Sequence, residues 1–483
     1  MNALDIGIIA AYFLGMLIIG VYAGKKQKGF DDYFLGGRSM GAWTLGCLWM
    51  AGWIGGSSVS GTASNGYSMG ITAVWYVFSL AIGLLVFGFT MTKPIKRVGD
   101  KLNNITIPDF LEARYDSKTR LAATISIFIA TIGFVASQFV VGASALSVMT
   151  GWELGKCYII TAVTITLYVA AGGLLAVTYT DAIQMILLLG GVVIIGVPLT
   201  ISAVNSTGQT LTEALPPEYF DLGARGWENI LALAVSSGIS FFTMMDSYTR
   251  CISAKSAKAA RNGTIVAAVA VIFIALSCTY LGMAAKVLLP DSVNDNDALP
   301  ALIVHVFPHG VKGLVLVGIL SAVMSTADIS ILMASTNVVK DVYMRYVNPG
   351  FNEKKSAYMG FAVALAVGAA ACWFGWYSND VVSILLLTYT VNSAGLFLPI
   401  ICAFFWKRAC SNAAFCSIVS AAIVIVVWYI FSITTDISLF KVSSLWPALI
   451  VSGAAFFLIS LRHRQTEGEL AKAERFIAIA NKD

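Results

Sequence analysis

Charge, histidine and paired cysteine are all scarce in this sequence. Charged residues make up 12% of the 483, about half of the roughly 25% that soluble domains carry. The eight cysteines form no CxxC pair, so neither a disulfide framework nor a cysteine-bound metal is indicated. Two of the three histidines, His305 and His309, are four residues apart, but Pro308 between them disfavours a helical metal pair. No P-loop is present, so ATP is not expected to supply energy.

The sequence is rich instead in apolar runs, each near the roughly 20 residues that cross a bilayer. They predict an all-α integral membrane protein with 13 transmembrane helices. The first run lacks a basic n-region and a cleavage site, so it is interpreted as a retained span and not as a signal peptide. The expected spans are 4–24, 42–68, 71–92, 119–149, 157–176, 180–203, 228–250, 263–286, 311–340, 356–377, 381–405, 412–432 and 444–461.

Basic residues flank these runs unevenly. With the N-terminus outside, the positive-inside rule is satisfied by all but five of the 31 Lys and Arg. The five exceptions are Lys156, Arg225, Lys286, Lys312 and Lys441. The C-terminus is then cytoplasmic, and the expected location is the plasma membrane, which in a bacterium is the inner membrane. Because this bias accounts for the net charge of +5, membrane lipids are expected partners and nucleic acid is not.

One apolar helix, from Gly318 to Asp341, carries many polar side chains. A carboxylate flanked by hydroxyls supplies the oxygen ligands that a small hard cation needs. The alternative is that the hydroxyls bond back to their own helix and hold it against its neighbours. Residues spaced by four, three, four and three share one face of this helix: Ser321, Ser325, Asp328, Leu332 and Ser335.

Three acids are expected near the middle of the membrane, namely Asp181, Asp246 and Asp328, and no Lys or Arg is expected at that depth. Buried acids without basic partners need protons, metal ions or a cationic substrate. Asp246 has a second interpretation, because an ion pair with Arg250 four residues later on the same helix would satisfy it. Its functional role would be in the inner gate or in attracting a cationic solute.

Two spans contain clusters of small polar residues that weaken a helix. The first cluster is Gly52–Gly66 in the second span, and the other is Ser236–Ser240 in the seventh. Breaks five spans apart are what an inverted repeat of five helices would produce, with free carbonyls offered to ions and solute. The alternative is that the small residues only allow close helix packing.

Four motifs, in this order along the chain, resemble the sodium/solute symporter family, which includes sodium-coupled proline, sugar, sialic acid, pantothenate and choline carriers. The motifs are DYFLGGRS (32–39), GGLLAVTYTDAIQ (172–184), RCISAKSAKAARNG (250–263) and LSAVMSTADISIL (320–332). The resemblance implies a LeuT-type fold with a 5+5 inverted-repeat core. The implied parts are an extra N-terminal helix and loop (1–41), the first repeat (42–203), an outer loop (204–227), the second repeat (228–408), two peripheral helices (409–461) and a cytoplasmic tail (462–483).

The resemblance also implies a co-transported sodium ion, Na+, at a core site. The ligands it implies are two hydroxyls and three carbonyls, those of Ser325, Thr326, Ala322, Gly56 and Val59. Asp181 matches an acid that holds a second sodium in some members. Those members place hydroxyls where this chain has Asp328 and Ile329, so either Asp328 replaces a ligand or Asp181 has another role. Proline carriers have an acid at the position of Ser58, which disfavours proline here.

The solute is expected near the midplane, between the two breaks. Because no base is expected there, a neutral or cationic small organic solute is favoured, although a helix N-terminus could receive the carboxylate of an amino acid. The expected wall residues are Trp53, Ser57, Trp75, Tyr76, Gln138, Phe241, Phe242 and Asn392.

Sodium-driven secondary active symport is therefore the predicted function. Three alternatives are open: proton coupling through Asp328, a transporter-like sensor that reports solute to a partner, and a membrane enzyme. The enzyme is disfavoured because the spans contain no nucleophile or histidine–acid constellation. The Gly/Ala-rich last span is compatible with a monomer or with a loose homodimer.

Overall fold

The computed structural model describes residues 2–26, 29–290, 293–351, 355–377, 381–435, 437, 440 and 443–481. Within these ranges every regular element is a helix, apart from one isolated bridge between Met40 and Ala254. In this part of the chain, nine helical runs are long and apolar enough to cross a bilayer, or ten with one bent pair. The all-helical prediction is confirmed, and the count of thirteen spans stays a prediction.

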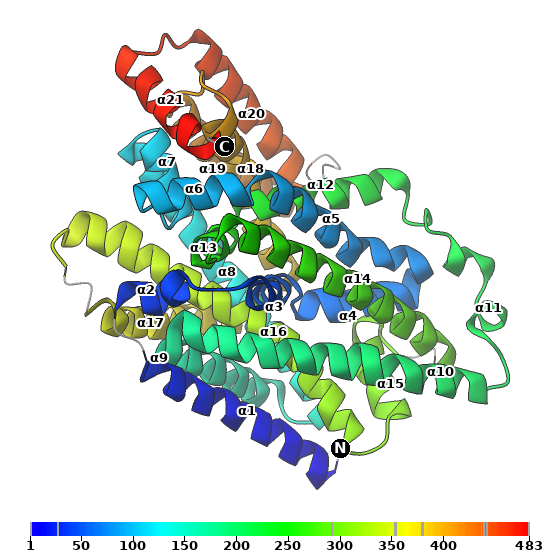
Figure 1. Ribbon diagram of the computed structural model, residues 1–483. Coiled ribbons are helices and arrows are strands. Elements are labelled where there is room, and N and C mark those ends of the chain that lie inside the picture. Colours follow the sequence, from blue (N-terminus) through cyan, green and yellow to red (C-terminus); the bar gives the residue numbers. More distant parts are fainter. Residues whose placement is uncertain are drawn as a thin grey trace.

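The helices form one elongated bundle (Figure 1). The N-terminus lies at the end of the bundle that holds α10, α11 and α15, and the C-terminus lies toward the end with α6 and α7 (Figure 1). The helices are α1 (Ala3–Gly24), α2 (Phe30–Leu35), α3 (Ala42–Trp53), α4 (Gly56–Met69), α5 (Val74–Thr90), α6 (Thr92–Leu102), α7 (Ile107–Arg114), α8 (Ser117–Thr150), α9 (Leu154–Leu188), α10 (Val197–Ser206), α11 (Leu211–Ala214), α12 (Trp227–Thr243), α13 (Met245–Ser253), α14 (Ala257–Leu288), α15 (Ala298–Val306), α16 (Val311–Thr336), α17 (Ser356–Tyr377), α18 (Val381–Phe405), α19 (Ser411–Thr434), α20 (Leu445–Arg462) and α21 (Glu467–Asn481).

Helix α16 is the centre of the bundle. In the run from α16 through the π-helix η6 (Asn337–Val347), 94% of the most apolar window is buried, whereas no other candidate span exceeds 56%. A membrane helix that carries hydroxyls and a carboxylate belongs inside a bundle and not at its lipid-facing surface. The polar face of α16 is therefore enclosed by protein, and α1, α3, α8 and α9 pack against it.

Helix α9 folds back on itself at Gly173. The helical run Leu154–Ser206 has 53 residues and would be roughly 80 Å long if straight, far more than a bilayer needs. Gly173 leaves the helical conformation with φ 48° and ψ −151°. On either side of it, the hydroxyls of Tyr168 and Thr180 both reach the same oxygen of Asp328, which requires the chain to reverse between them. One continuous run therefore supplies two spans.

The expected broken helices are present. Between α3 and α4 the chain leaves the helix at Ile54, with φ −101° and ψ 79°. Between α12 and α13 it does so at Met244, where the two helices are bent by 54°. The expected break at Ser236–Ser240 was wrong in position, because this stretch stays helical. The Ser240 hydroxyl bonds back to the Ser236 carbonyl at 2.9 Å, which keeps both polar groups satisfied within the helix.

The C-terminal segment was expected only as a polar tail. After α20 the chain instead forms α21, which buries Ala473, Phe476, Ile479 and Ala480 against the rest of the bundle. It packs on α6, α7 and α18. The tail is therefore an ordered part of the fold.

Replacing Gly173 with alanine should destabilise the protein. The backbone there has a conformation open almost only to glycine, and a Cβ would lie 2.6 Å from the Tyr33 carbonyl oxygen. We expect a loss of about 1–3 kcal/mol in unfolding free energy, seen as a lower melting temperature of the purified protein. Gly15→Ala in α1 is the matched control, because nothing lies within 4 Å of its added Cβ. Equal melting temperatures for the two variants would contradict the assignment of the turn to Gly173.

Candidate functional site

Two hydroxyls of α16 meet the broken end of α3. The Ser325 hydroxyl lies 3.1 Å from the Ala51 carbonyl oxygen and 3.3 Å from that of Ala322. The Thr326 hydroxyl lies 2.9 Å from Ala51 O and 3.0 Å from Ala322 O. Four oxygens from two helices thus converge at one buried point. Hydroxyl and carbonyl oxygens of this kind are ligands for a hard cation.

The break explains why the Ala51 carbonyl is available. In a continuous helix it would accept from the N–H four residues later, at Gly55. The chain leaves the helix at Ile54, so that bond is not made, and the carbonyl accepts the two hydroxyls instead. An unpartnered carbonyl in this buried position would be costly. The carbonyl freed by the broken helix is therefore satisfied by the hydroxyls on the polar face of α16.

The carbonyls of Gly56 and Val59, which the family resemblance implies as ligands, are not the ones that the α16 hydroxyls contact in this structure. Gly56 begins α4 and packs so closely on Val323 that an added Cβ would lie 2.3 Å from that side chain. Val59 is fully buried, and its N–H bonds to the Gly55 carbonyl. The α16 hydroxyls reach the carbonyl of Ala51, which the sequence analysis did not single out.

Asp328 and Asp181 are completely buried. Asp328 accepts a hydrogen bond of 2.7 Å from the Tyr168 hydroxyl and one of 3.5 Å from Thr180. Its other oxygen and both oxygens of Asp181 have no hydrogen-bond partner among the described residues. Burying an ionised carboxylate without a partner is strongly unfavourable. These two acids therefore require a proton or a bound cation.

The first helix extends this polar region. The Tyr12 hydroxyl of α1 lies 3.0 Å from the amide nitrogen of Gln184 and 3.2 Å from the Ser321 hydroxyl. Gln184 is one turn beyond Asp181 on α9, and Ser321 is two turns before Asp328 on α16. The helix outside the expected repeat core thus closes the region around the two acids.

A small cavity lies between the two breaks. Its free volume is about 40 Å³, well below the roughly 300 Å³ at the lower end of small-molecule sites. Trp53 lines it and stacks on Phe241, with ring centroids 3.8 Å apart. The lining residues are Gly52, Trp53, Ala130, Thr131, Phe134, Met244, Met245, Asp246, Ile329, Ser330, Met333 and Asn392. This conformation must widen before an organic solute fits.

Asp246 has a basic partner, so the expectation that it lacked one was wrong. It forms the i,i+4 ion pair with Arg250 that the sequence offered as the alternative. The Arg250 side chain is 1% exposed, lies 5.0 Å from the Trp49 ring, and packs its Nη2 against Gly52 at the first break. A base therefore does lie beside the broken helix, because the long arginine side chain reaches inward from the last turn of α13.

The other expected wall residues are dispersed. Trp75 donates to the Leu222 carbonyl at 3.0 Å and does not line the cavity, nor does its neighbour Tyr76. Phe242 packs edge-on against Phe87 and Phe397. Gln138 is buried beside Gly55. Ser57 lies in α4, but its side chain is outside the described residues.

Sequence reasoning missed Tyr168 and Thr180 as partners of Asp328. Thr180 had a signal, because it directly precedes Asp181 in the motif VTYTDAIQ. Tyr168 had none, since it lies on the other arm of the α9 hairpin, in an apolar stretch. Only the fold back at Gly173 brings it to the acid.

The sequence model of the Sodium:solute symporter family matches residues 33–420, which include both broken helices, α9 and α16. The chain belongs to the sodium:solute symporter family. Sodium-coupled solute symport is the activity that this membership carries, with Na+ as the co-transported ion. As a member of this family the protein is a multi-pass membrane transporter.

Curated relatives match this symporter over nearly its full length. The sodium/pantothenate symporter of Escherichia coli K12 is 28% identical and covers 93% of this chain and 95% of its own. The sodium/proline symporter of Staphylococcus aureus strain NCTC 8325 is also 28% identical and covers 94% of this chain and 91% of its own.

Solved structures show the same fold. A Na+-coupled sialic acid symporter, in a substrate-bound outward-open state, aligns with a TM-score of 0.77. It is 23% identical and covers 96% of this chain and 98% of its own. A nucleobase-cation-symport-1 family transporter in a closed conformation gives 0.58 at 14% identity, over 93% of this chain and 99% of its own. The predicted LeuT-type fold is confirmed.

Removing both hydroxyls should weaken sodium binding. In a Ser325→Ala, Thr326→Ala protein we expect the sodium concentration for half-maximal thermal stabilisation to rise at least about tenfold, because the cation loses two of its coordinating oxygens. The measurement is a melting curve across a sodium titration at constant ionic strength. Ser335→Ala is the matched control, since its hydroxyl bonds back to Ile331 at 2.7 Å. Unchanged sodium dependence in the double variant would remove these hydroxyls from the ion site.

Proposed function

We propose that this symporter imports a small organic solute by alternating access, with sodium bound where the broken end of α3 meets α16. The observation that carries the proposal is the convergence of the Ser325 and Thr326 hydroxyls on the freed Ala51 carbonyl. Sodium at this point would fasten the broken helix to the buried centre of the bundle. It would thereby favour one of the two access states.

The ligand set we propose combines these two hydroxyls with carbonyls of the broken helix and of Ala322. Ala51 supplies its carbonyl in the conformation described here. The carbonyls of Gly56 and Val59 are still expected to become sodium ligands, after a small rearrangement of the chain at the same break. Because the hydroxyls now donate to carbonyls, ion binding would turn their oxygen lone pairs toward the cation.

For the solute we propose the cavity between the two breaks. Its lining includes an acid, Asp246, and no base, and the acid is balanced by Arg250 behind it. A solute without net negative charge, including a zwitterion, fits this environment best. Trp53 and Phe241 would form its apolar wall, and Asn392 a polar contact. The Asp246–Arg250 pair would then act at the inner gate.

The uneven distribution of basic residues in the sequence gives the proposed orientation of the protein in the membrane. With the N-terminus outside, α6, α7 and α21 face the cytoplasm. The plasma membrane, in a bacterium the inner membrane, is the proposed location. Sodium would enter down its gradient from the side of the N-terminus, and bound sodium and solute would each raise the affinity for the other.

A second coupling cation is proposed at Asp181 and Asp328. The three unpartnered carboxylate oxygens, deep among α1, α9 and α16, support it. Either a sodium ion or a proton would neutralise this pair. Tyr168 and Thr180 replace the hydroxyls expected at the positions of Asp328 and Ile329.

Sodium-driven uptake is the direct test of the proposed function. A thermal-shift screen in sodium and in choline-free potassium buffer would first identify a solute that stabilises the protein only with sodium. In proteoliposomes this solute should accumulate when a sodium gradient is imposed and not when sodium is equal on both sides. Uptake that is independent of sodium but is lost when the pH gradient is dissipated would favour proton symport. Binding without accumulation would favour a sensor.

The number of coupled ions tests the second site. The steady-state solute gradient sustained by a fixed sodium and pH gradient depends on how many cations move with each solute. We expect Asp181→Asn and Asp328→Asn to couple one cation fewer, with solute binding retained. Repeating the measurement with and without a pH gradient distinguishes a lost proton from a lost sodium. Tyr168→Phe is the control that removes a hydrogen bond but no charge. Full coupling in both Asn variants would contradict a second site.

A further inference from the structure

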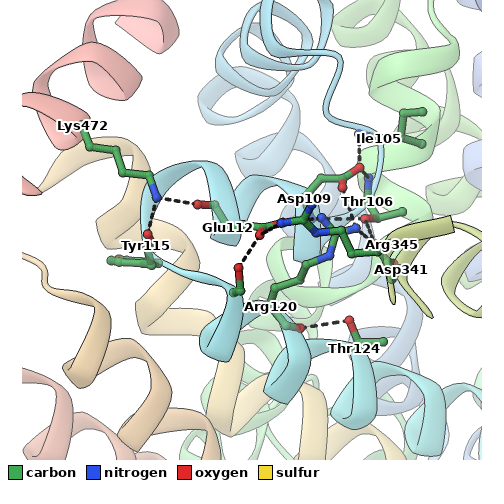
Figure 2. Close-up of polar contacts among 11 residues, drawn as sticks. Ile105, Thr106, Asp109, Glu112, Tyr115, Arg120, Thr124, Asp341, Arg345 and Lys472 are labelled. Carbon is green, nitrogen blue, oxygen red and sulfur yellow. Dashed lines mark hydrogen bonds and ion pairs between the residues drawn. The ribbon is translucent and has the colours of Figure 1, made fainter. Parts of the chain in front are cut away.

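The last helix, α21, is fastened to the end of the bundle beside α6 and α7 by charged groups at specific positions (Figure 2). The Lys472 ammonium donates to the carbonyls of Glu112, at 2.8 Å, and Tyr115. Both carbonyls belong to the C-terminal end of α7, where helix carbonyls lack helical partners. Lys472 therefore caps α7 from a distance of more than 350 residues in sequence.

The segment that Lys472 caps is part of a larger ionic network. Arg120 on α8 lies 2.8 Å from Asp109, 2.6 Å from Glu112 and 2.7 Å from Asp341 (Figure 2). Asp341 is in η6, the direct continuation of α16. Burial alone would raise the pKa of Glu112, but hydrogen bonds from Ser117, Arg120 and Arg345 outweigh it and lower the pKa to about 2. Glu112 is therefore ionised at neutral pH and pairs with Arg120, which also contacts Asp341 and so links α7 to the continuation of α16.

A chain of aromatic rings runs from α21 to the second broken helix. Phe476 packs on Phe404 of α18 with centroids 5.3 Å apart, and Phe404 lies 6.0 Å from Phe110 of α7. Phe110 in turn packs edge-on against Tyr248 of α13 at 5.3 Å. Tyr248 is fully buried and donates to the Phe242 carbonyl at the break. Contacts from α21 thus reach the helix that carries Asp246.

These contacts join the segment that follows α5 to the segment that packs on α8. Helix α6 follows α5 directly and packs on α13, whereas α7 is held to α8 and η6. Helix α21 lies across both α6 and α7. A second attachment fixes its start, because the Gln465 amide donates to the Lys407 carbonyl at 2.9 Å. Opening this end of the bundle would strain or break the span of α21.

We propose that α21 is a strap that holds this end of the transporter closed, with Lys472 as its clasp on α7. The strap sets how often α13 opens toward the side of the C-terminus, and so the rate of release on that side. This role goes beyond the proposed coupling of sodium to solute. It predicts that loosening the strap increases opening without any change at the ion-binding hydroxyls.

The native Cys251 reports this opening. It is fully buried on α13, next to Arg250, so a maleimide reaches it only when this end opens. In full-length purified protein, peptide mass spectrometry would follow its labelling. For Lys472→Met we expect labelling about fivefold faster, the effect of losing roughly one net hydrogen bond. Lys472→Arg, which keeps a cationic donor, should restore the slow rate. Phe476→Leu is a second variant that loosens the aromatic contact by another route.

Two controls separate a strap from general loosening. Arg475→Met removes a charge from the exposed face of the same helix and should leave Cys251 unchanged. Cys278, fully buried in α14, reports unfolding of the bundle. Faster labelling of Cys251 alone supports the strap. Equal acceleration of both cysteines, or faster labelling of Cys410 beside α21 with Cys251 unchanged, would overturn it. Since no solute is needed, the outcome is independent of the symport proposal.

Discussion

A carbonyl freed by a broken helix must find another donor when it is buried within a membrane bundle. At Ala51 the donors are two hydroxyls of α16, and this single contact explains why a polar face can exist on the most buried of the candidate membrane spans in the described part of the chain. The arrangement of these polar groups therefore depends on the break in α3. If α3 were continuous, the carbonyl would be occupied and the hydroxyls would have only their own helix to bond to. The break and the hydroxyl pair therefore form one structural unit.

The buried acids impose a second constraint on the same helix. Asp328 faces a hairpin of α9 that contributes Asp181 from one arm and Tyr168 from the other. Hydrogen bonds satisfy one oxygen of the Asp181 and Asp328 carboxylates and leave the other three unpartnered among the described residues. In a low-dielectric interior such an arrangement is stable only with a neutralising charge. The Ser325 and Thr326 hydroxyls lie within one turn of Asp328 on α16, so a cation bound in one region would bear on the other.

Charge at the opposite end of α16 has a different function. Arg120 brings three carboxylates together, and one of them, Asp341, lies in η6, the continuation of α16. An ionic network of this kind gives directional attachment more than net stability, because desolvation offsets much of the attraction. The extra helices at the two chain ends both contribute to the centre. Helix α1 supplies Tyr12 to the acid region, and α21 supplies Lys472 to the network beside Asp341.

The sequence by itself determined the class of the fold and the presence of broken helices, because hydropathy and small polar clusters are local properties of the chain. The roles expected of the Ser325 and Thr326 hydroxyls came from the family resemblance. The sequence also marked Asp181 and Asp328 as unusual, since charge in an apolar run is visible without a structure. Tertiary structure alone decided that Ala51 meets the hydroxyls, that Tyr168 reaches Asp328, and that the tail returns to cap α7. It also selected the Arg250 ion pair from the two interpretations of Asp246 that the sequence left open. Each of these is a contact whose partners are brought together by a turn, a bend or a long side chain. The sequence shows which polar groups require a partner, and only packing in three dimensions selects which partner each of them has.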